Sequence, residues 1–225
     1  IGARYRIAED WHLYWINPGD SGLPTKVSFE ALPEGVTIEG PAYPGPVRFG
    51  SEGDIVNYGY HGVLVLPLTM SGTVPEGTTS LTAKASWLAC RDDACVPGKA
   101  DATLDLASSA DAASLNALSA SRSQLPTSLD EIGDTIAIER GIPKEDGAVE
   151  VLVHAPSSST LEIFPLIDEA LSEVRSGSVE KHAELRFTLR PVADESDLAV
   201  LSVKDASGSH FYLFDNDWLS TRQPQ

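Results

Sequence analysis

The stretch WLACRDDACVPGKA, residues Trp87–Ala100, holds both cysteines of the chain, Cys90 and Cys95, with four residues between them. The intervening Arg91–Ala94 is long enough to form a turn that brings the two Cα atoms within disulfide distance. Two interpretations are open, a structural disulfide that closes a small loop and a dithiol pair that performs redox chemistry. We favour the redox pair, because so short a loop constrains the unfolded chain little and stabilises less than a long-range bridge.

The residues around the cysteines predict a thiol of moderate acidity. Arg91 and Lys99 favour a thiolate, whereas Asp92 and Asp93 oppose it. Such a thiol suits reversible disulfide exchange better than the chemistry of a dedicated oxidant. The pair is not the CxxC of a thioredoxin active site. With no histidine inside the stretch, two cysteines also make a poor zinc site.

The sequence on both sides of the cysteines alternates between apolar and polar residues, as strands of an antiparallel sheet do. Leu81–Trp87 leads to Cys90, and Ala102–Leu106 leads away from the pair. Pro97-Gly98 is typical of a turn and predicts the end of the cysteine loop. The loop is therefore expected at one end of a sheet.

Two stretches nearer the start of the chain bear on this site. In Trp11–Ile16, alternate residues predict a strand with two faces, Trp11, Leu13 and Trp15 on one and His12, Tyr14 and Ile16 on the other. Pro41–Gly53 is rich in proline and glycine and predicts an irregular surface loop. An aromatic segment, Asp54–Tyr60, follows it.

The second half of the chain repeats the β character without a cysteine. Ser108–Ser123 is rich in alanine and serine and predicts a helix or helical linker. Strand alternation returns after Asp134, as it would in a second β-sandwich. We therefore predict an all-β chain of two tandem β-sandwich domains, at residues 1–110 and 126–225, with a short helical linker at 111–125.

Composition bounds the class of partner and the compartment. The chain has 225 residues, 42% of them hydrophobic, which is enough for one large or two small domains. A net charge of −17 argues against nucleic acid and anionic membrane surfaces as partners. No apolar run approaches the roughly 18–20 residues of a membrane span. No basic and apolar leader stands at Ile1, so we expect a signal peptide to be absent or removed.

Three ordered motifs resemble the periplasmic N-terminal region of DsbD-type disulfide-interchange reductases, and most closely their ScsB branch. They are WHLYWINPGDSGLPT at Trp11–Thr25, VNYGYHGVLVLPL at Val56–Leu68 and WLACRDDACVPGKADATL at Trp87–Leu104. The resemblance covers most of the first hundred residues. It implies immunoglobulin-like sandwiches that precede a membrane-embedded electron carrier, and hence a periplasmic location.

The resemblance also implies roles for particular residues. Cys95 matches the cysteine that forms mixed disulfides with partners, and Cys90 matches its resolving partner. A cap loop shields the pair in this family, and by order the matching segment is about Arg48–Tyr60. The aromatic residues of that segment are the shielding candidates, namely Phe49, Tyr58 and Tyr60.

The function that the resemblance implies is protein-disulfide reduction without a cofactor or metal. The pair would receive electrons from a thioredoxin-like domain of the same polypeptide and pass them to periplasmic thioredoxin-fold proteins of the ScsC and DsbC type. One alternative is a non-enzymatic immunoglobulin-like interaction module with a structural disulfide. Another is a copper-binding module for copper tolerance, suggested by Cys90, Cys95, His12 and His61, since thiolates suit Cu(I).

Overall fold

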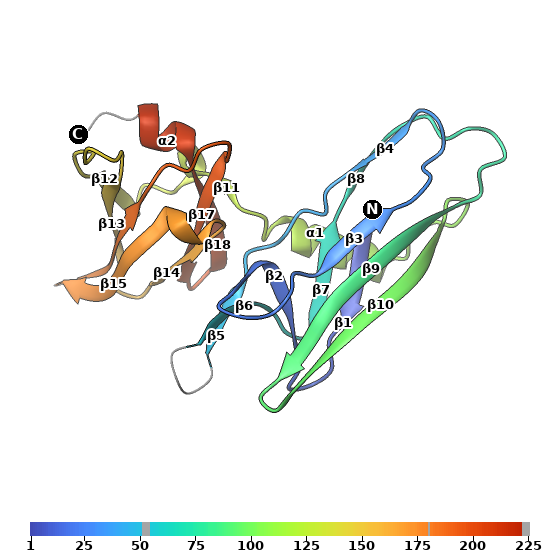
Figure 1. Cartoon of the computed structure of the whole chain (residues 1–225), viewed down its shortest axis with the longest axis horizontal. Helices are drawn as coiled ribbons and strands as arrows, with labels where there is room; N and C mark the ends of the chain where they lie inside the picture. The colour runs from blue at the N-terminus through green and yellow to red at the C-terminus, as the bar shows by residue number, and fades with distance from the viewer. Residues whose placement is uncertain (51–54, 180, 222–225) are drawn as a thin grey trace. The chain divides into compact units, whose positions relative to one another are not determined.

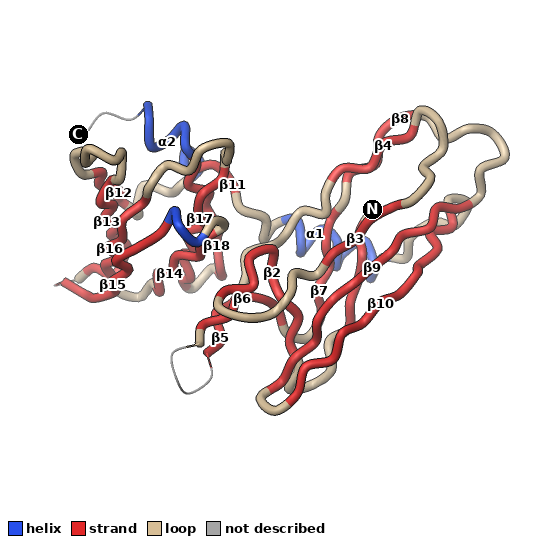
Figure 2. Tube along the Cα trace, in the orientation of Figure 1, coloured by secondary structure: helices blue, strands red, loops and turns tan. Residues whose placement is uncertain are grey.

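The computed structural model describes residues 1–50, 55–179 and 181–221, and strands make up most of it (Figures 1 and 2). Contacts between residues divide the chain into two compact units, Ile1–Leu125 and Pro126–Gln225. Each unit is built mostly from antiparallel strands that pack around an apolar core, and the short pair β11–β18 of the second unit is parallel. The predicted all-β, immunoglobulin-like fold class is confirmed.

The largest sheet of the first unit has the strand order β10-β9-β2-β6-β5, and β3 also pairs with β9. Its strands are β2 (His12–Gly19), β3 (Lys26–Phe29), β5 (Val47–Gly50), β6 (Val56–Tyr60), β9 (Ser80–Arg91) and β10 (Ala94–Asp105). Two shorter ladders complete the unit, β1 (Gly2–Arg6) with β7 (Val63–Pro67) and β4 (Val36–Glu39) with β8 (Thr69–Gly72).

Strand β2 lies in the middle of the large sheet and has the two faces that its alternation predicts. Leu13 is opposite Tyr60 of β6, and Trp15, only 1% exposed, packs edge-on against Tyr58 with ring centroids 6.5 Å apart. These four side chains share the apolar face. His12 stands on the other face, where a sheet strand places every second residue.

The hairpin β9–β10 corrects the prediction that Pro97-Gly98 forms a turn. The turn is Asp92-Asp93, and Pro97 and Gly98 lie within β10. Pro97 is tolerated because β10 is an edge strand, where a missing N–H costs no ladder bond. Gly98 is opposite Trp87, and an added Cβ would lie 2.3 Å from Cε2 of that indole. The glycine therefore makes room for a cross-strand aromatic ring.

The proline- and glycine-rich segment Pro41–Gly53 is not wholly irregular. Its residues Val47–Gly50 form β5, which pairs with β6 from Val47↔Gly59 to Gly50↔Val56. Residues 51–53 lie outside the described residues, so the loop prediction applies here only to residues 41–46, which form no regular structure. Pairing with β6 supplies the hydrogen bonds that the composition of this segment does not predict.

The helix predicted within Ser108–Ser123 is present as α1 (Ala112–Arg122). It begins at an N-cap, Asp111, whose carboxylate accepts a hydrogen bond from the Ser114 amide at 2.6 Å. The helix packs on β7, where the buried hydroxyl of Ser121 donates to the Val65 carbonyl at 2.6 Å. Its contacts therefore place α1 in the first unit. No helix within the described residues has the length and apolarity to cross a membrane.

The second unit is a sandwich of two four-stranded sheets, ordered β11-β18-β17-β14 and β12-β13-β16-β15. Its strands are β11 (Thr127–Ser128), β12 (Ala137–Arg140), β13 (Val149–Pro156), β14 (Thr160–Pro165), β15 (Leu171–Val179), β16 (His182–Leu189), β17 (Asp197–Asp205) and β18 (Gly208–Asp215). Short helices are η1 (Leu129–Glu131), η2 (Asp168–Ala170) and α2 (Asn216–Thr221). Phe187, Phe214 and Trp218 pack edge-to-face in its core.

Candidate functional site

The two cysteines are bonded to each other near the end of the long hairpin β9–β10 (Figure 1). Arg91 and Ala94 close the two-residue turn, and the next pair of residues is Cys90 and Cys95, directly opposite one another. In a two-residue hairpin this second pair is not hydrogen-bonded, and such pairs bring the backbones closest. The observed Cα–Cα distance is 4.1 Å. The turn therefore sets the two sulfurs side by side.

The two sulfurs differ in exposure. Cys90 lies on β9, between β10 and β2, and is only 2% exposed. Cys95 lies on the edge strand β10 and is exposed. A thiolate that attacks a disulfide must reach one sulfur along the S–S axis, so access decides which sulfur is attacked. An approaching thiol reaches Cys95, and Cys90 becomes the leaving group.

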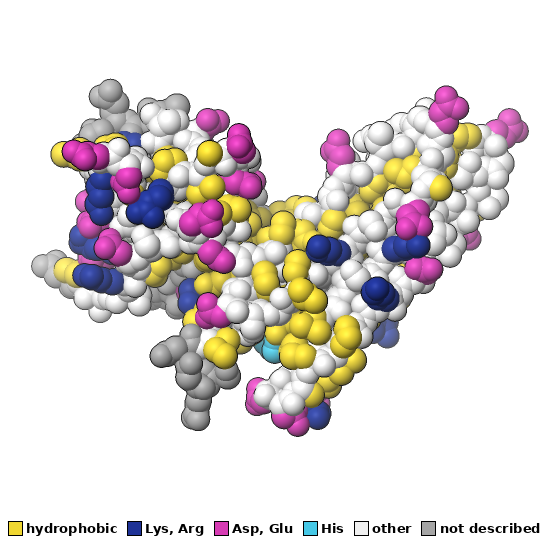
Figure 3. All heavy atoms as spheres, viewed as in Figure 1, with side chains coloured by type: hydrophobic (Ala, Val, Ile, Leu, Met, Phe, Trp, Pro, Cys, Tyr) yellow, Lys and Arg dark blue, Asp and Glu magenta, His cyan; other side chains and the backbone are white. Residues whose placement is uncertain are grey.

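The charges of the hairpin end are not aimed at the disulfide. Arg91 forms an ion pair with Asp93 at 2.7 Å, and its guanidinium lies 5.2 Å from the ring centre of Trp11. Adjacent strand residues point to opposite faces, so Arg91 and its neighbour Cys90 face away from each other. Figure 3 shows charged side chains at this end of the hairpin, where Arg91, Asp92 and Asp93 are exposed. The sequence-based expectation that Arg91 favours a thiolate is therefore not supported.

A polar side chain, that of His12, stands across the sheet from the disulfide. It is directly opposite Cys90 in the β2–β9 register, so the two share a face of the sheet and their Cβ atoms lie about 5 Å apart. His12 is half-buried and its ring centre lies 6.0 Å from that of His61. Burial lowers the pKa of His12 below its usual value, His61 lowers it further, and Asp92 partly opposes both effects.

Of the three predicted shielding residues, Phe49 alone shares the face of the cysteines. Its ring centre lies 4.5 Å from that of His12 and 4.9 Å from that of His61. Because Phe49 is opposite Asn57 in the register, it stands on the same side of the sheet as Gly59 and His61. It reaches the neighbourhood of Cys90 through the His12 ring.

Tyr58 and Tyr60 face the opposite side of the sheet and are each 8% exposed. Tyr58 packs on Trp15, and the Tyr60 hydroxyl donates to the Pro44 carbonyl at 2.7 Å. Both therefore belong to the core of the first unit, which corrects their assignment as shielding candidates. Periodicity alone could have separated them from Phe49 only if the β5–β6 register were known.

Four residues suggested a copper site, namely His61, His12, Cys90 and Cys95. The structure brings them into one row across the sheet. The cysteines are bonded to each other, and a disulfide offers no thiolate to a metal. Within the described residues no group of three or more His, Cys, Asp or Glu side chains is arranged to hold a metal ion. The structure thus adds no support to a copper-binding role.

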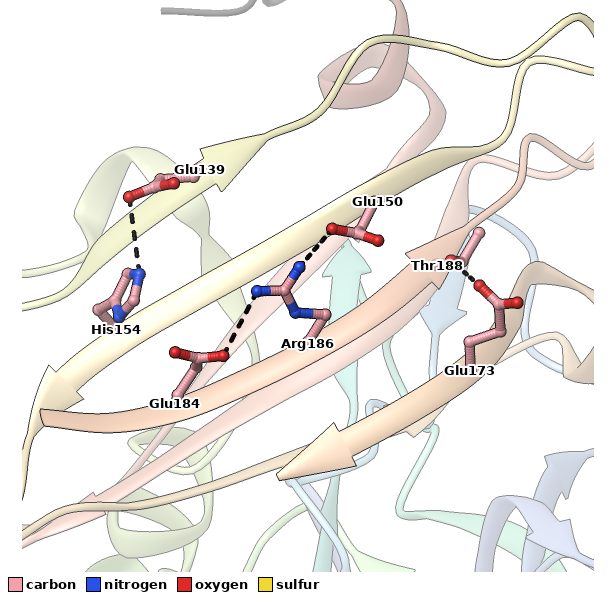
Figure 4. A network of polar contacts seen from close by, with 7 residues as sticks. All are labelled: Glu139, Glu150, His154, Glu173, Glu184, Arg186 and Thr188. Atoms are coloured by element: carbon pink, nitrogen blue, oxygen red, sulfur yellow. Dashed lines mark hydrogen bonds and ion pairs between the residues drawn. The ribbon is translucent and has the colours of Figure 1, made fainter. Parts of the chain in front are cut away.

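The second unit carries a polar network but no sulfur. On the sheet of β12, β13, β15 and β16, Arg186 lies between Glu150 at 2.6 Å and Glu184 at 3.5 Å, and His154 lies 3.6 Å from Glu139 (Figure 4). These side chains are partly or largely exposed, and exposed ion pairs stabilise a fold little. We assign this network to the surface of the sandwich.

A groove with a volume of about 300 Å³ lies on the apolar side of the hairpin. Strands β1, β3, β9 and β10 form it, and alanines such as Ala83, Ala85 and Ala100 line much of it. Tyr5 and Trp87 meet edge-to-face at one end, with ring centres 5.7 Å apart. The groove faces away from the side of the sheet that carries the cysteines.

Comparisons with known proteins agree on the first unit. Residues 1–107 match the family described as thiol:disulfide interchange protein DsbD, N-terminal. The fold is similar to the crystal structure of the N-terminal periplasmic domain of ScsB from Proteus mirabilis, with a TM-score of 0.67 and 15% sequence identity. The similarity covers 95% of this chain and 85% of that one. No curated protein sequence matches the chain.

Proposed function

We propose that Cys90 and Cys95 are the redox-active pair of a protein-disulfide reductase, because residues 1–107 match the DsbD N-terminal family. The observation that carries this proposal is the unequal exposure of two bonded sulfurs at the end of a hairpin. The sulfur of Cys95 is accessible to a partner, and the sulfur of Cys90 is buried and available to resolve a mixed disulfide. A purely structural bridge needs no such difference.

The exchange proceeds in balanced steps. To accept electrons, the thiolate of a protein dithiol bonds to Sγ of Cys95, and the S–S bond to Cys90 breaks with its electron pair on Cys90. The second thiol of the donor then attacks the donor's own sulfur in the mixed disulfide and releases Cys95 as a thiolate. The donor leaves as a disulfide, and the pair has gained two electrons. Reduction of a partner follows the same steps in reverse.

We further propose the direction of this exchange and its partners. A thioredoxin-like domain of the same polypeptide, fed by a membrane-embedded carrier, would donate the electrons in the periplasm. Thioredoxin-fold proteins of the ScsC and DsbC type would receive them. The similar Proteus mirabilis domain is described as periplasmic, which supports an oxidising surrounding in which the pair needs such a reductant.

A redox titration separates this function from a structural disulfide. The β9–β10 ladder already holds Cys90 opposite Cys95, and the bond closes a separation of only five residues, so it adds little stability. We expect a reduction potential above about −300 mV, in the range of exchanging pairs. A potential well below that value, together with no exchange with protein dithiols, would favour the non-enzymatic interaction module.

Shielding of the pair by Phe49 is a testable proposal. We expect Phe49→Ala to speed reaction of the reduced pair with glutathione disulfide several-fold, because the ring that covers His12 beside Cys90 is removed. Val47→Ala is the matched control, since Val47 is on the same strand and face and is 49% exposed. Stopped-flow oxidation measures both. Equal rates in a folded Phe49→Ala variant would make β5 an ordinary edge strand.

We also propose that the first domain extends to Leu125 and that the second begins at Pro126. The fragment 1–125 is expected to fold with the redox potential of the whole chain. The fragment 1–110 lacks α1 and with it the Ser121 bond to Val65, so we expect it to be less stable by about 2 kcal/mol. Urea unfolding of both fragments measures the difference. Equal stability of the two fragments would mean that residues 111–125 are a linker and not part of the first domain.

A further inference from the structure

His12 has a position that disulfide chemistry by itself does not require. It is directly opposite Cys90, which is itself directly opposite Cys95, so three consecutive strands carry the three side chains in one row. His12 is on β2, inside the sheet, and Cys95 is on the edge strand β10, with Cys90 on β9 between them. The leaving sulfur therefore lies between the sulfur that meets partners and an imidazole.

The imidazole packs among other rings, and one of its two nitrogens lacks a hydrogen-bond partner among the described residues. Aromatic rings surround it, with ring centres at 4.5 Å for Phe49, 5.1 Å for Tyr14 and 6.0 Å for His61. Its Nε2 atom is buried and has no hydrogen-bond partner within the described part of the chain. Buried polar atoms are normally paired, so an unpaired one needs an explanation. Reduction of the disulfide creates a thiol on Cys90, and that thiol is a donor.

We propose that His12 is the proton acceptor for Cys90, taking the thiol proton as Cys90 attacks a mixed disulfide on Cys95 and returning it when Cys90 leaves. The inference rests on the proposed function and adds a residue to its mechanism. The register position of His12, its unpaired nitrogen and the rings packed against it support this role.

The proton and the electrons balance in this step. When Cys95 is bonded to a partner sulfur, Sγ of Cys90 attacks Sγ of Cys95 and its proton passes to His12. The bond from Cys95 to the partner breaks, and the partner leaves as a thiolate with the electron pair. The Cys90–Cys95 disulfide forms again, and His12 loses its proton to solvent. General-base assistance of this kind requires a neutral imidazole within reach of the proton.

Burial and His61 favour the neutral form of His12 that a base needs, and Asp92 opposes it. His61 faces it from the end of β6, Asp92 lies at the hairpin turn, and Tyr14 and Cys90 are its titratable neighbours on β2 and β9. Burial is the largest cause of its lowered pKa, and His61 adds to the effect. A base acts above its own pKa, so His12 would assist Cys90 at pH values where a free thiol is still protonated.

Resolution of a glutathione mixed disulfide tests the inference with one small reagent. Reduced protein is mixed with glutathione disulfide, and the reaction is quenched at intervals. Mass spectrometry then measures the amount of mixed disulfide on Cys95 at each time. In His12→Phe, which keeps an aromatic ring, we expect resolution near neutral pH to slow by about tenfold or more. The difference should vanish at alkaline pH, where Cys90 loses its proton to solvent.

Two controls separate proton transfer from packing. His61→Phe removes the other imidazole of the row and is expected to leave the resolution rate within about twofold of the original, because His61 is one strand farther from Cys90. An equal slowing in His61→Phe and His12→Phe would overturn the proposal. The proposal would also be overturned if the resolution rate of His12→Phe depended on pH in the same way as that of the original protein.

A measurement on the unaltered side chain covers the case in which His12→Phe does not fold. Imidazole ¹⁵N shifts of the whole chain are recorded for the oxidised protein, the reduced protein and reduced Cys90→Ala. On reduction we expect the ¹⁵N shift of His12 to change toward that of a nitrogen that accepts a hydrogen bond. In Cys90→Ala, which lacks the Cys90 thiol, we expect no such change. No change on reduction would overturn the proposal. If the protein resolves the glutathione mixed disulfide with the help of His12 but does not react with protein dithiols, only the proposed function is contradicted.

Discussion

Replacing Cys90 by serine is expected to trap a partner on Cys95, and replacing Cys95 by serine is expected to trap none. In reduced Cys90→Ser, the exposed thiol of Cys95 still attacks a partner disulfide. The mixed disulfide then persists, because the sulfur that would resolve it is gone. In Cys95→Ser the remaining thiol is only 2% exposed and cannot align with a protein disulfide. Turnover should fall to background in both variants.

The measurement is non-reducing electrophoresis after mixing each reduced variant with an oxidised thioredoxin-fold protein. The matched control is the double variant, which should give no adduct. The adduct of Cys90→Ser should disappear on addition of a reductant and should map to a peptide that contains Cys95. An adduct formed equally well by Cys95→Ser would mean that the hairpin opens and exposes Cys90, and the order of attack proposed above would then be wrong.

Local patterns predicted the parts of the fold that depend on local geometry. The alternation of Trp11–Ile16 correctly separated Leu13 and Trp15 from His12 and Tyr14, because side chains alternate across any strand. The spacing of Cys90 and Cys95 allowed a turn that brings the two Cα atoms together, and the structure has such a turn at Asp92-Asp93. Both inferences needed only the covalent geometry of a short segment.

The errors arose where pairing with another strand decides the structure. Pro97-Gly98 is a turn by composition, yet the indole of Trp87 lies across Gly98 and the edge position of β10 tolerates Pro97. The same holds for the site. His12 became a candidate only when the β2–β9 register placed it opposite Cys90, and registers between strands far apart in sequence are set by packing that no local pattern reports.

Gly59 is packed against both the backbone of β2 and the Phe49 ring of the site. It is buried on β6 opposite Tyr14, and a Cβ there would lie 2.0 Å from the Leu13 carbonyl oxygen and 3.0 Å from Cζ of Phe49. The first contact is with backbone, which cannot rotate away, so β6 would have to separate from β2. We expect Gly59→Ala to lower the free energy of unfolding by about 3 kcal/mol, at the upper end of overpacking costs.

The same change should loosen the site, because Phe49 rests over Gly59 as well as over His12. We therefore expect Gly59→Ala to react faster with glutathione disulfide than the original protein, in the direction of Phe49→Ala. Gly177→Ala on β15 is the control, since no atom lies within 4 Å of its added Cβ, and its stability should change by less than about 0.5 kcal/mol. Urea unfolding followed by tryptophan fluorescence reports on both units, because Trp15 is buried beside Tyr58 in the first and Trp218 beside Phe214 in the second. Unchanged stability in Gly59→Ala would mean that β2 and β6 lie farther apart than the structure has them, and the enclosure of His12 by Phe49 would fail with it.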